Sequence, residues 1–299
     1  LNFPQAVRLG SVVAGEDGYL LINGEKISHD AISKAYESRY AKVYPPTAEA
    51  STKALLPAGL GKVSKTKAAT YPGEKVEKPI AYLPIFPGTN CDYDTAKAFR
   101  KAGAEVKTSV FCNLTPEDVL ASIDEMCENI NNCHILGFCG GFSAGDEPDG
   151  SGKFIASVIG NAKVSAAIEG LIARKGLILG ICNGFQALIK SGLLPYGKPG
   201  AVTIDSPTLF RNDINRHISQ MVTTAVATTA SPWLKGFNKG DMHTIAVSHG
   251  EGKFVVNEEF ARELFANGQV AFQYVDPLEE EVTMESPYNP NGSYYGIEG

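Results

Sequence analysis

The sequence predicts an α/β fold: a doubly wound, mostly parallel sheet flanked by helices, with a small N-terminal appendage. From residue 80 onward, short apolar segments alternate with helix-like segments, as in chains of strand–helix units. The apolar segments are nearly continuous, which is typical of parallel strands buried on both faces. Hydrophobic residues make up 43% of the 299 residues, enough for a large domain with a sizeable core.

The strand–helix units can be followed along the chain. Strands are predicted at residues 80–86, 104–111, 133–139 and 177–181, and helices at 92–102, 115–130, 153–174 and 183–190. Thr115, Pro116 and Asp118 resemble a capping box at the start of the second helix. Gly160 predicts a break in the third helix, and Gly192 ends the fourth. Further strands are predicted at 221–228, 243–248, 253–256 and 269–274.

The first 78 residues have a different organisation. Residues 1–56 contain a predicted strand at 19–22, a tight turn at Asn23-Gly24, and a weak helical pattern over 27–40 opened by Ser28. This part is too small to bury a core alone. Residues 57–78 are rich in Lys, Gly, Ala and Pro and contain few large apolar residues, which predicts a linker. The alternative, a phosphate-binding patch of lysines, is not favoured because Gly61-Lys62-Val63 lacks the phosphate-loop pattern. We therefore expect three parts: residues 1–56, 57–78 and 79–299.

Composition and charge argue against several classes of protein. The net charge of −6 is unlike the basic surface of a nucleic-acid-binding protein. No segment approaches the roughly 18 apolar residues of a membrane span, and residues 1–10 do not resemble a signal peptide. Six scattered cysteines without a Cys-x-x-Cys pair favour free thiols in a reducing cytoplasm, and they predict no metal site.

Residues 180–184, Gly-Ile-Cys-Asn-Gly, carry the clearest chemical motif. They lie between a buried strand and a helix, which is the arrangement of a nucleophile elbow with Cys182 as nucleophile. Side chains larger than Gly at positions 180 and 184 would crowd the turn. The helix N-terminus favours a thiolate, and the backbone N–H of Asn183 points where an oxyanion would form. The competing interpretation is a buried cysteine at a tight turn.

Two further loops follow predicted strands. Residues 140–146, Gly-Gly-Phe-Ser-Ala-Gly-Asp, are expected at the same sheet edge, where Gly141 could supply a second oxyanion donor. His249 follows the strand at 243–248 and is predicted to be the base, with Glu251 orienting it. The two side chains share one side if the strand continues through them. Taken alone, the first loop could be an ordinary Gly-rich strand-to-helix connection, and the His-x-Glu of the second could have no catalytic role.

The other cysteines carry weaker indications. Cys91 follows the strand at 80–86 and could line the same cleft in a supporting role. Cys133, His134 and Cys139 lack a fourth spaced ligand, so they do not predict a metal site.

Together these motifs resemble a known family. Gly180 to Gln186 (Gly-x-Cys-x-Gly-x-Gln), followed by His249-x-Glu251, is similar to the class I (triad) glutamine amidotransferases, which have a flavodoxin-like sheet. Within that class, residues 86–92, 140–146, 182–186 and 249–254 resemble the phosphoribosylformylglycinamidine synthase family. The resemblance covers about three quarters of the chain.

The resemblance implies an activity and its residues. L-Glutamine would be hydrolysed to glutamate and ammonia, and the ammonia supplied to formylglycinamide ribonucleotide amination in purine biosynthesis. The nucleophile, base and acid fall on Cys182, His249 and Glu251, and the oxyanion donors on Gly141 and Asn183. Substrate-binding residues are expected at Gly140, Phe142 and Gln186. No cofactor is implied in this domain; ATP and Mg²⁺ belong to a synthetase portion.

Residues 23–28 and 36–46 resemble the tail of that synthetase portion in fused, single-chain forms, so residues 1–56 are expected to be such a tail and the synthetase a partner. Some positions depart from the family. Cys139 replaces a common Pro, residues 209–217 match only partly, and family members usually continue beyond Gly299. The alternatives are another elbow-cysteine hydrolase, a redox-sensing cysteine protein on a similar sheet, and a non-catalytic interaction module.

Overall fold

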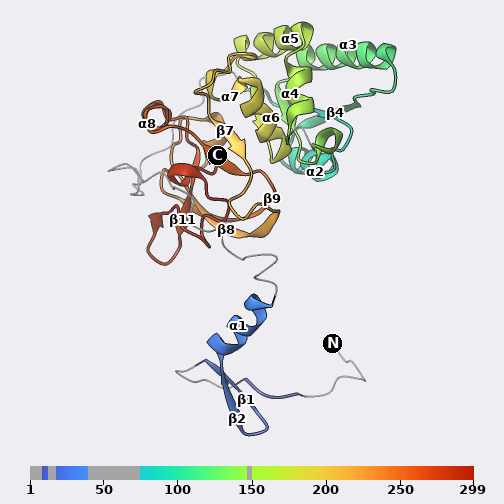
Figure 1. Ribbon diagram of the computed structural model, residues 1–299. Coiled ribbons are helices and arrows are strands. Elements are labelled where there is room, and N and C mark those ends of the chain that lie inside the picture. Colours follow the sequence, from blue (N-terminus) through green and yellow to red (C-terminus); the bar gives the residue numbers. More distant parts are fainter. Residues whose placement is uncertain (1–8, 13–17, 40–74, 147–149) are drawn as a thin grey trace. The chain divides into compact units, whose positions relative to one another are not determined.

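The computed structural model describes residues 9–12, 18–39, 75–146 and 150–299. The chain divides into two units, residues 1–48 and 49–299 (Figure 1). Most of the predicted linker, residues 57–74, lies outside the described residues. The boundaries predicted for the three parts therefore stay predictions.

The first unit contains a β-hairpin followed by a helix. Strands β1 (Tyr19–Ile22) and β2 (Glu25–Ser28) pair antiparallel around Asn23 and Gly24. Both turn residues have positive φ, 51° and 88°, as a type I′ turn requires. Helix α1 (His29–Ser38) begins where the Ser28 hydroxyl accepts a hydrogen bond from the Ala31 N–H at 3.2 Å. The predicted strand, turn and helix cap are confirmed.

The second unit contains a four-stranded parallel sheet. Its strands are β3 (Ile80–Ile85), β4 (Glu105–Val110), β5 (Ile135–Phe138) and β6 (Leu177–Gly180), in the order β4-β3-β5-β6. The predicted parallel sheet is thus confirmed. Its order is flavodoxin-like, and the direction of winding reverses between β3 and β5. Ligands of such sheets bind at this reversal, beyond the carboxyl ends of the strands.

Helices cover both faces of this sheet. Tyr82 and Leu136 face a cluster that includes side chains of four helices: α3 (Pro116–Asn132), α4 (Lys153–Ile159), α5 (Ala162–Ala173) and α6 (Asn183–Ser191). Figure 1 shows α3 and α5 side by side. Ala81 and Leu83 point the other way and pack with Phe99 of α2 (Asp92–Lys101). The capping box at Thr115 and the helix break near Gly160 are both present.

The later strands do not extend the parallel sheet. Strands β8 (Ile218–Val226), β9 (Met242–His249), β11 (Phe272–Asp276) and β12 (Glu281–Val282) form an antiparallel sheet in the order β12-β11-β8-β9. Strand β7 (Thr208–Phe210) pairs antiparallel with β10 (Lys253–Val255). The connection from β8 to β9 contains only the 3-10 turn Pro232–Leu234 and no crossover helix of the kind that usually covers a parallel sheet, so antiparallel pairing is favoured.

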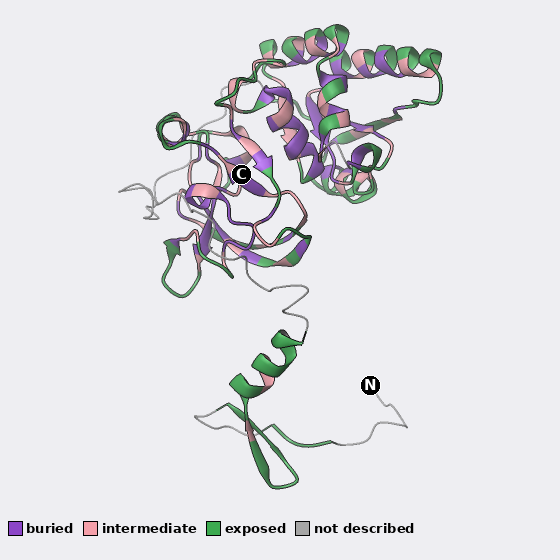
Figure 2. Ribbon diagram, in the orientation of Figure 1, coloured by how far each residue is buried: buried purple, intermediate pink, exposed green. Residues whose placement is uncertain are grey.

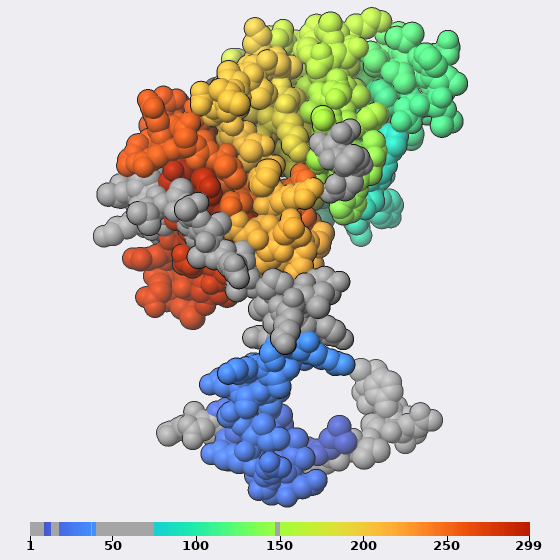
Figure 3. All heavy atoms as spheres, viewed as in Figure 1, coloured from blue at the N-terminus to red at the C-terminus, as the bar shows by residue number. Residues whose placement is uncertain are grey.

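Helix α6 connects the parallel sheet to the pair formed by β7 and β10. Its Ala187 and Leu188 lie in the core of the parallel sheet, whereas Ile189 packs with Phe254 and with Leu264 of α8 (Glu258–Ala266). The short helix α7 (Leu193–Tyr196) follows it. Figure 2 shows buried residues both around the parallel sheet and around the later strands of the second unit. In Figure 3 the yellow-green and the orange-red segments of this unit lie in contact. Within the described residues, no single helix is long and apolar enough to cross a membrane; α4 and α5 pass that test only as a pair bent by 80°.

Candidate active site

Three loops meet where the winding of the parallel sheet reverses. They follow β3, β5 and β6 and contain Cys91, Gly141 and Cys182 respectively. Thr89 and Gly141 form an isolated β-bridge, and the Phe142 N–H donates to the Gly88 carbonyl at 2.9 Å. The topology therefore brings together the Gly140-Gly141 loop and the cysteine elbow, as predicted from their positions after strands.

The elbow holds Cys182 in an unusual backbone conformation. Its φ is 52° and its ψ is −108°, a region that non-glycine residues rarely adopt and that costs of order 1–3 kcal/mol. An alanine at position 184 would place its β-carbon 2.1 Å from the Phe138 carbonyl oxygen. At position 180, a β-carbon would lie 2.7 Å from the Gly184 carbonyl carbon. The prediction that only glycine fits at both positions is thus confirmed.

The thiol of Cys182 experiences opposing electrostatic effects. Although Cys182 as a residue is exposed, protein atoms enclose its thiol, and this burial raises the thiol pKa. Backbone N–H groups of Asn183 and Gly141 point toward the thiol and lower its pKa, but by less. The helix N-terminus therefore does not by itself produce a thiolate. Attack by Cys182 requires a base that removes its proton.

His249 ends strand β9 and reaches the edge of this site. The Cys182 Sγ lies 3.7 Å from the carbonyl oxygen of Ser248. The His249 ring packs against Gly252, where a β-carbon would lie 2.2 Å from the ring Cε1. Its Nδ1 is buried and has no hydrogen-bond partner among the described residues. Burial lowers the pKa of His249 to about 4, so the ring is neutral at pH 7 and can accept a proton.

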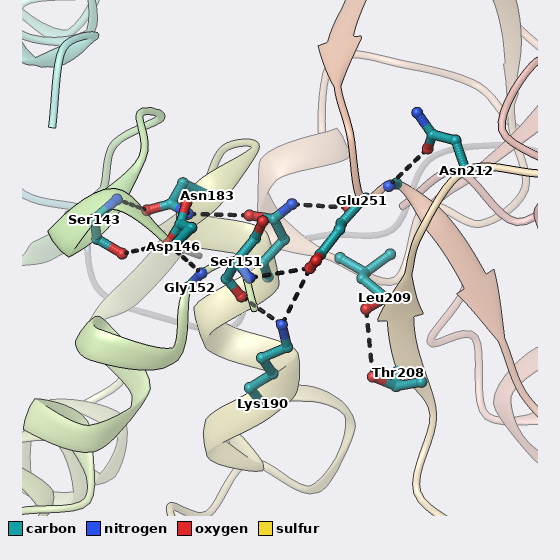
Figure 4. A network of polar contacts seen from close by, with 12 residues as sticks. Ser143, Asp146, Ser151, Gly152, Asn183, Lys190, Thr208, Leu209, Asn212 and Glu251 are labelled. Carbon is teal, nitrogen blue, oxygen red and sulfur yellow. Dashed lines mark hydrogen bonds and ion pairs between the residues drawn. The ribbon is translucent and has the colours of Figure 1, made fainter. Parts of the chain in front are cut away.

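Glu251 does not contact the His249 ring nitrogen in the structure. Its Oε2 accepts a hydrogen bond from the Ser151 N–H at 3.0 Å and lies 3.4 Å from the Lys190 Nζ (Figure 4). The expectation that both side chains share one side of a strand assumed that the strand continues. Strand β9 ends at His249 and the chain bends at residues 250–251, so the strand alternation stops there.

Asn183 and Gln186 are buried and belong to one polar network. Figure 4 shows Asn183 of this network beside Asp146 and Ser143. The Asn183 Oδ1 accepts from the Ser143 N–H at 3.2 Å, and its Nδ2 donates to Asp146 at 2.9 Å and to the Gln186 Oε1 at 3.1 Å. The Gln186 Nε2 donates to the Glu251 carbonyl at 2.8 Å. Both ends of the Gln186 amide are thus bonded within the protein. Phe142, by contrast, is exposed at this edge.

Comparison with known proteins places this arrangement in a family. The model of the CobB/CobQ-like glutamine amidotransferase domain matches residues 78–299. The chain belongs to this family. Two relatives named phosphoribosylformylglycinamidine synthase subunit PurQ are similar to it. That of Roseobacter denitrificans is 33% identical over 219 residues, covering 73% of this chain and 80% of the relative. That of Methanococcus maripaludis strain C5 is 36% identical over 217 residues, covering 71% and 73%.

A solved structure, that of PurLQS from Thermotoga maritima, supports the same fold for this amidotransferase domain. The chains are 26% identical, with a TM-score of 0.51 and coverage of 74% of this chain and 80% of that chain.

Three residues of the amidotransferase site were not assigned a role from the sequence. Asp146 accepts from Asn183 and from the Gly152 N–H at 3.0 Å, and Lys190 contacts Glu251. Asn212 is buried; its Nδ2 donates to the His249 carbonyl at 2.8 Å and its Oδ1 accepts from the Gly252 N–H at 3.1 Å. Asn212 thereby fixes the turn that follows His249. Asp146 ends the Gly-rich motif at 140–146, so the sequence contained a signal for its place in the site. Lys190 belongs to no local motif, so the sequence contained no such signal for it.

A cavity of about 620 Å³ extends along β6 and reaches Cys182. Its lining is mainly apolar and includes Ile178, Phe185, Trp233 and Phe272. The described part of the chain contains no group of three or more His, Cys, Asp or Glu residues that could hold a metal ion.

Proposed function

We propose that this chain is the glutaminase domain of a phosphoribosylformylglycinamidine synthase. It would hydrolyse L-glutamine to glutamate and ammonia, and the ammonia would aminate formylglycinamide ribonucleotide in purine biosynthesis. The observation that carries the proposal is the Cys182 elbow, with the backbone N–H groups of Asn183 and Gly141 directed at the same thiol. Membership of the amidotransferase family and the names of the PurQ relatives support the same assignment.

The proposed reaction begins when Cys182 attacks the side-chain amide carbon of glutamine. The thiol proton passes to a base as the S–C bond forms, because the raised pKa keeps the thiol protonated at rest. The two backbone N–H groups would stabilise the oxyanion, an effect worth about 10²–10³ in rate for each donor. The amide nitrogen accepts a proton from the protonated base and leaves as ammonia. Water then hydrolyses the thioester and releases glutamate.

His249 is the proposed base. Its ring is neutral at pH 7 because burial lowers its pKa, and the end of its strand borders Cys182. Glu251 is proposed as a positioning residue that holds the Ser151 loop and Lys190 against the turn after His249. The role in orienting His249 that the sequence predicts would require its carboxylate to leave these partners.

The remaining site residues have proposed supporting roles. Gln186 would position the 251 turn through its buried amide rather than bind glutamine directly. Gly140 and Phe142 would border the bound substrate, because they lie in the loop that carries Gly141. Glycine at position 140 leaves room beside Cys182, whose Cβ would lie 3.5 Å from a β-carbon added there.

The wider setting is also a proposal. A fused, single-chain synthetase is supported by the resemblance of residues 23–28 and 36–46 to a synthetase tail. A synthetase partner is supported by the similarity to the PurLQS structure. ATP and Mg²⁺ would act in that synthetase portion, and no cofactor is proposed at the Cys182 site. The cytoplasmic location stays a prediction from cysteine usage.

Ammonia release from glutamine, with and without a synthetase preparation, tests the proposal. Cys182→Ala should abolish release, whereas His249→Gln should lower it by roughly 10²–10⁴. Cys112→Ala, which changes another exposed cysteine, should behave as the unmodified chain. Ammonia release by Cys182→Ala would contradict the assignment of Cys182 as the nucleophile. Full ammonia release by His249→Gln would contradict only the assignment of His249 as the base.

The same assay separates the alternatives. A different elbow-cysteine hydrolase should not prefer glutamine over asparagine. A non-catalytic module should release no ammonia in either setting while circular dichroism shows that it is folded.

A further inference from the structure

A second thiol lies beside the proposed nucleophile. Cys91 is exposed and directly precedes α2, at the end of the loop that follows β3. Its N–H donates to the Gly140 carbonyl at 3.4 Å, and its Sγ donates to the Asn90 Oδ1 at 3.1 Å. The proposed reaction assigns Cys91 no role, although it shares the sheet edge with Cys182.

Gly140 lies beside both cysteines and has no side chain to come between them. A β-carbon at position 140 would lie 3.6 Å from the Cys91 Cβ, 3.3 Å from the Cys91 Sγ and 3.5 Å from the Cys182 Cβ. Both cysteines therefore border one point in space, and glycine leaves that point empty. The β-carbons of a disulfide lie about 3.5–4.5 Å apart, so joining these two thiols requires rotation of both side chains and movement of the loops after β3 and β6 toward each other.

We propose that Cys91 and Cys182 form a disulfide when the protein meets a peroxide, and that this modification reversibly blocks the nucleophile. The disulfide rests on geometry alone, whereas the loss of activity rests on the proposed function of Cys182.

The chemistry takes two steps. The Cys182 thiolate attacks one oxygen of hydrogen peroxide, so that an S–O bond forms, the O–O bond breaks and hydroxide leaves; sulfur is oxidised by two electrons and peroxide is reduced. The Cys91 thiolate then attacks the Cys182 sulfur, an S–S bond forms, and the S–O bond breaks to release hydroxide, which becomes water on taking up a proton. The backbone N–H groups near Cys182 would also stabilise the sulfenate oxygen.

The surroundings favour Cys91 over the third nearby thiol. Cys139 is buried, and burial raises its pKa to about 11, which keeps it protonated and enclosed. Cys91 is exposed and can reach both solvent and Gly140. Because burial also raises the pKa of Cys182, its oxidation should accelerate between pH 7 and pH 8.5.

Peroxide treatment of the whole chain, followed by alkylation and peptide mapping without reduction, tests the proposal. We expect a Cys91–Cys182 linked peptide, the loss of both free thiols, and full recovery by dithiothreitol. In Cys91→Ser, Cys182 should instead proceed to the sulfinic acid, which dithiothreitol does not reverse. Cys112→Ser, the matched exposed control, should form the link as the unmodified chain does.

Absence of the link, or a link from Cys91 to Cys139, would overturn the proposal. Ammonia release measured on the same samples keeps the two claims apart. If the disulfide forms without loss of ammonia release, the proposed disulfide is supported and the proposed catalytic role of Cys182 is contradicted. If ammonia release depends on Cys182 but no disulfide forms, the catalytic role of Cys182 is supported and the proposed disulfide is contradicted.

Discussion

At the scale of single residues, the backbone around Cys182 is the feature most tightly specified by the sequence. Gly184 packs its α-carbon against the Phe138 carbonyl, so a methyl group has no space there. The strained φ of Cys182 persists because Gly180 and Gly184 allow the strand and helix to approach closely.

Gly184→Ala should therefore destabilise the domain by about 3 kcal/mol or more, because a fixed backbone atom must move. Urea unfolding measures the change. Gly170→Ala is the matched control in helix α5, where the new β-carbon meets only the Arg174 Nη1 at 3.8 Å. That variant should gain up to about 1 kcal/mol. Equal stability of the two variants would contradict the close packing at the elbow.

His249 gives a second prediction at this scale. Its folded pKa of about 4 lies below the unfolded value near 6.5, so below pH 6.5 the unfolded chain binds the extra proton. The stability that the neutral ring contributes is present above pH 6.5 and is lost as pH falls toward 4. Between pH 7 and pH 5 this loss should be roughly 1–2 kcal/mol larger in the unmodified chain than in His249→Gln. Parallel pH profiles of the two unfolding energies would show that His249 is not buried as neutral imidazole.

Sequence reasoning found the elbow residues because a fixed spacing within one motif carries their geometry. It could not place the Glu251 side chain, because that depends on where β9 ends and on Lys190, which comes from a distant helix. Gln186 was identified as part of the motif, but its role depends on the partners of its buried amide.

At the scale of elements, helix α6 organises the site. Cys182 precedes its first residue, Asn183 and Gln186 belong to its first turns, and Lys190 extends from its last turn to Glu251. One helix therefore connects the elbow to the turn after β9. The Lys190–Glu251 pair is 23% and 13% exposed, so water weakens it less than a surface pair.

A double-mutant cycle tests this connection. If Glu251 positions the site through Lys190, Lys190→Met and Glu251→Gln should lower ammonia release to a similar extent, and the double variant should be no worse than either. If Glu251 orients His249, only the Glu251 variant should lose activity. Lys163→Met removes an exposed ion pair with Asp124 and should leave ammonia release unchanged.

The regular elements of the parallel sheet could be predicted because each strand and helix carries its own periodicity and caps. Helix α8 was missed, although Asn257 caps it and Glu258 and Glu259 fill its first turn. The antiparallel pairing of β8, β9 and β11 could not be derived from periodicity, because strand direction depends on the connections between strands.

At the scale of the whole molecule, the candidate site lies where two sheets meet. Cys182 follows the last strand of the parallel sheet, and His249 ends a strand of the antiparallel sheet. Gln186 of α6 connects these parts through its hydrogen bond to the Glu251 carbonyl, and Asn212, which lies between β7 and β8, bonds to residues 249 and 252. The nucleophile and its proposed base can therefore cooperate only when both sheets are folded and packed together.

The central claim is that Cys182 is a nucleophile specific for glutamine. Its most direct test is to treat the whole chain at pH 7.5 with a glutamine analogue that carries an electrophile in place of the side-chain amide, and to map the modified cysteine by mass spectrometry. We expect Cys182 to be labelled faster than the other five cysteines, and glutamine but not asparagine to protect it. Labelling of another cysteine in its place, or of Cys182 without protection by glutamine, would contradict the claim.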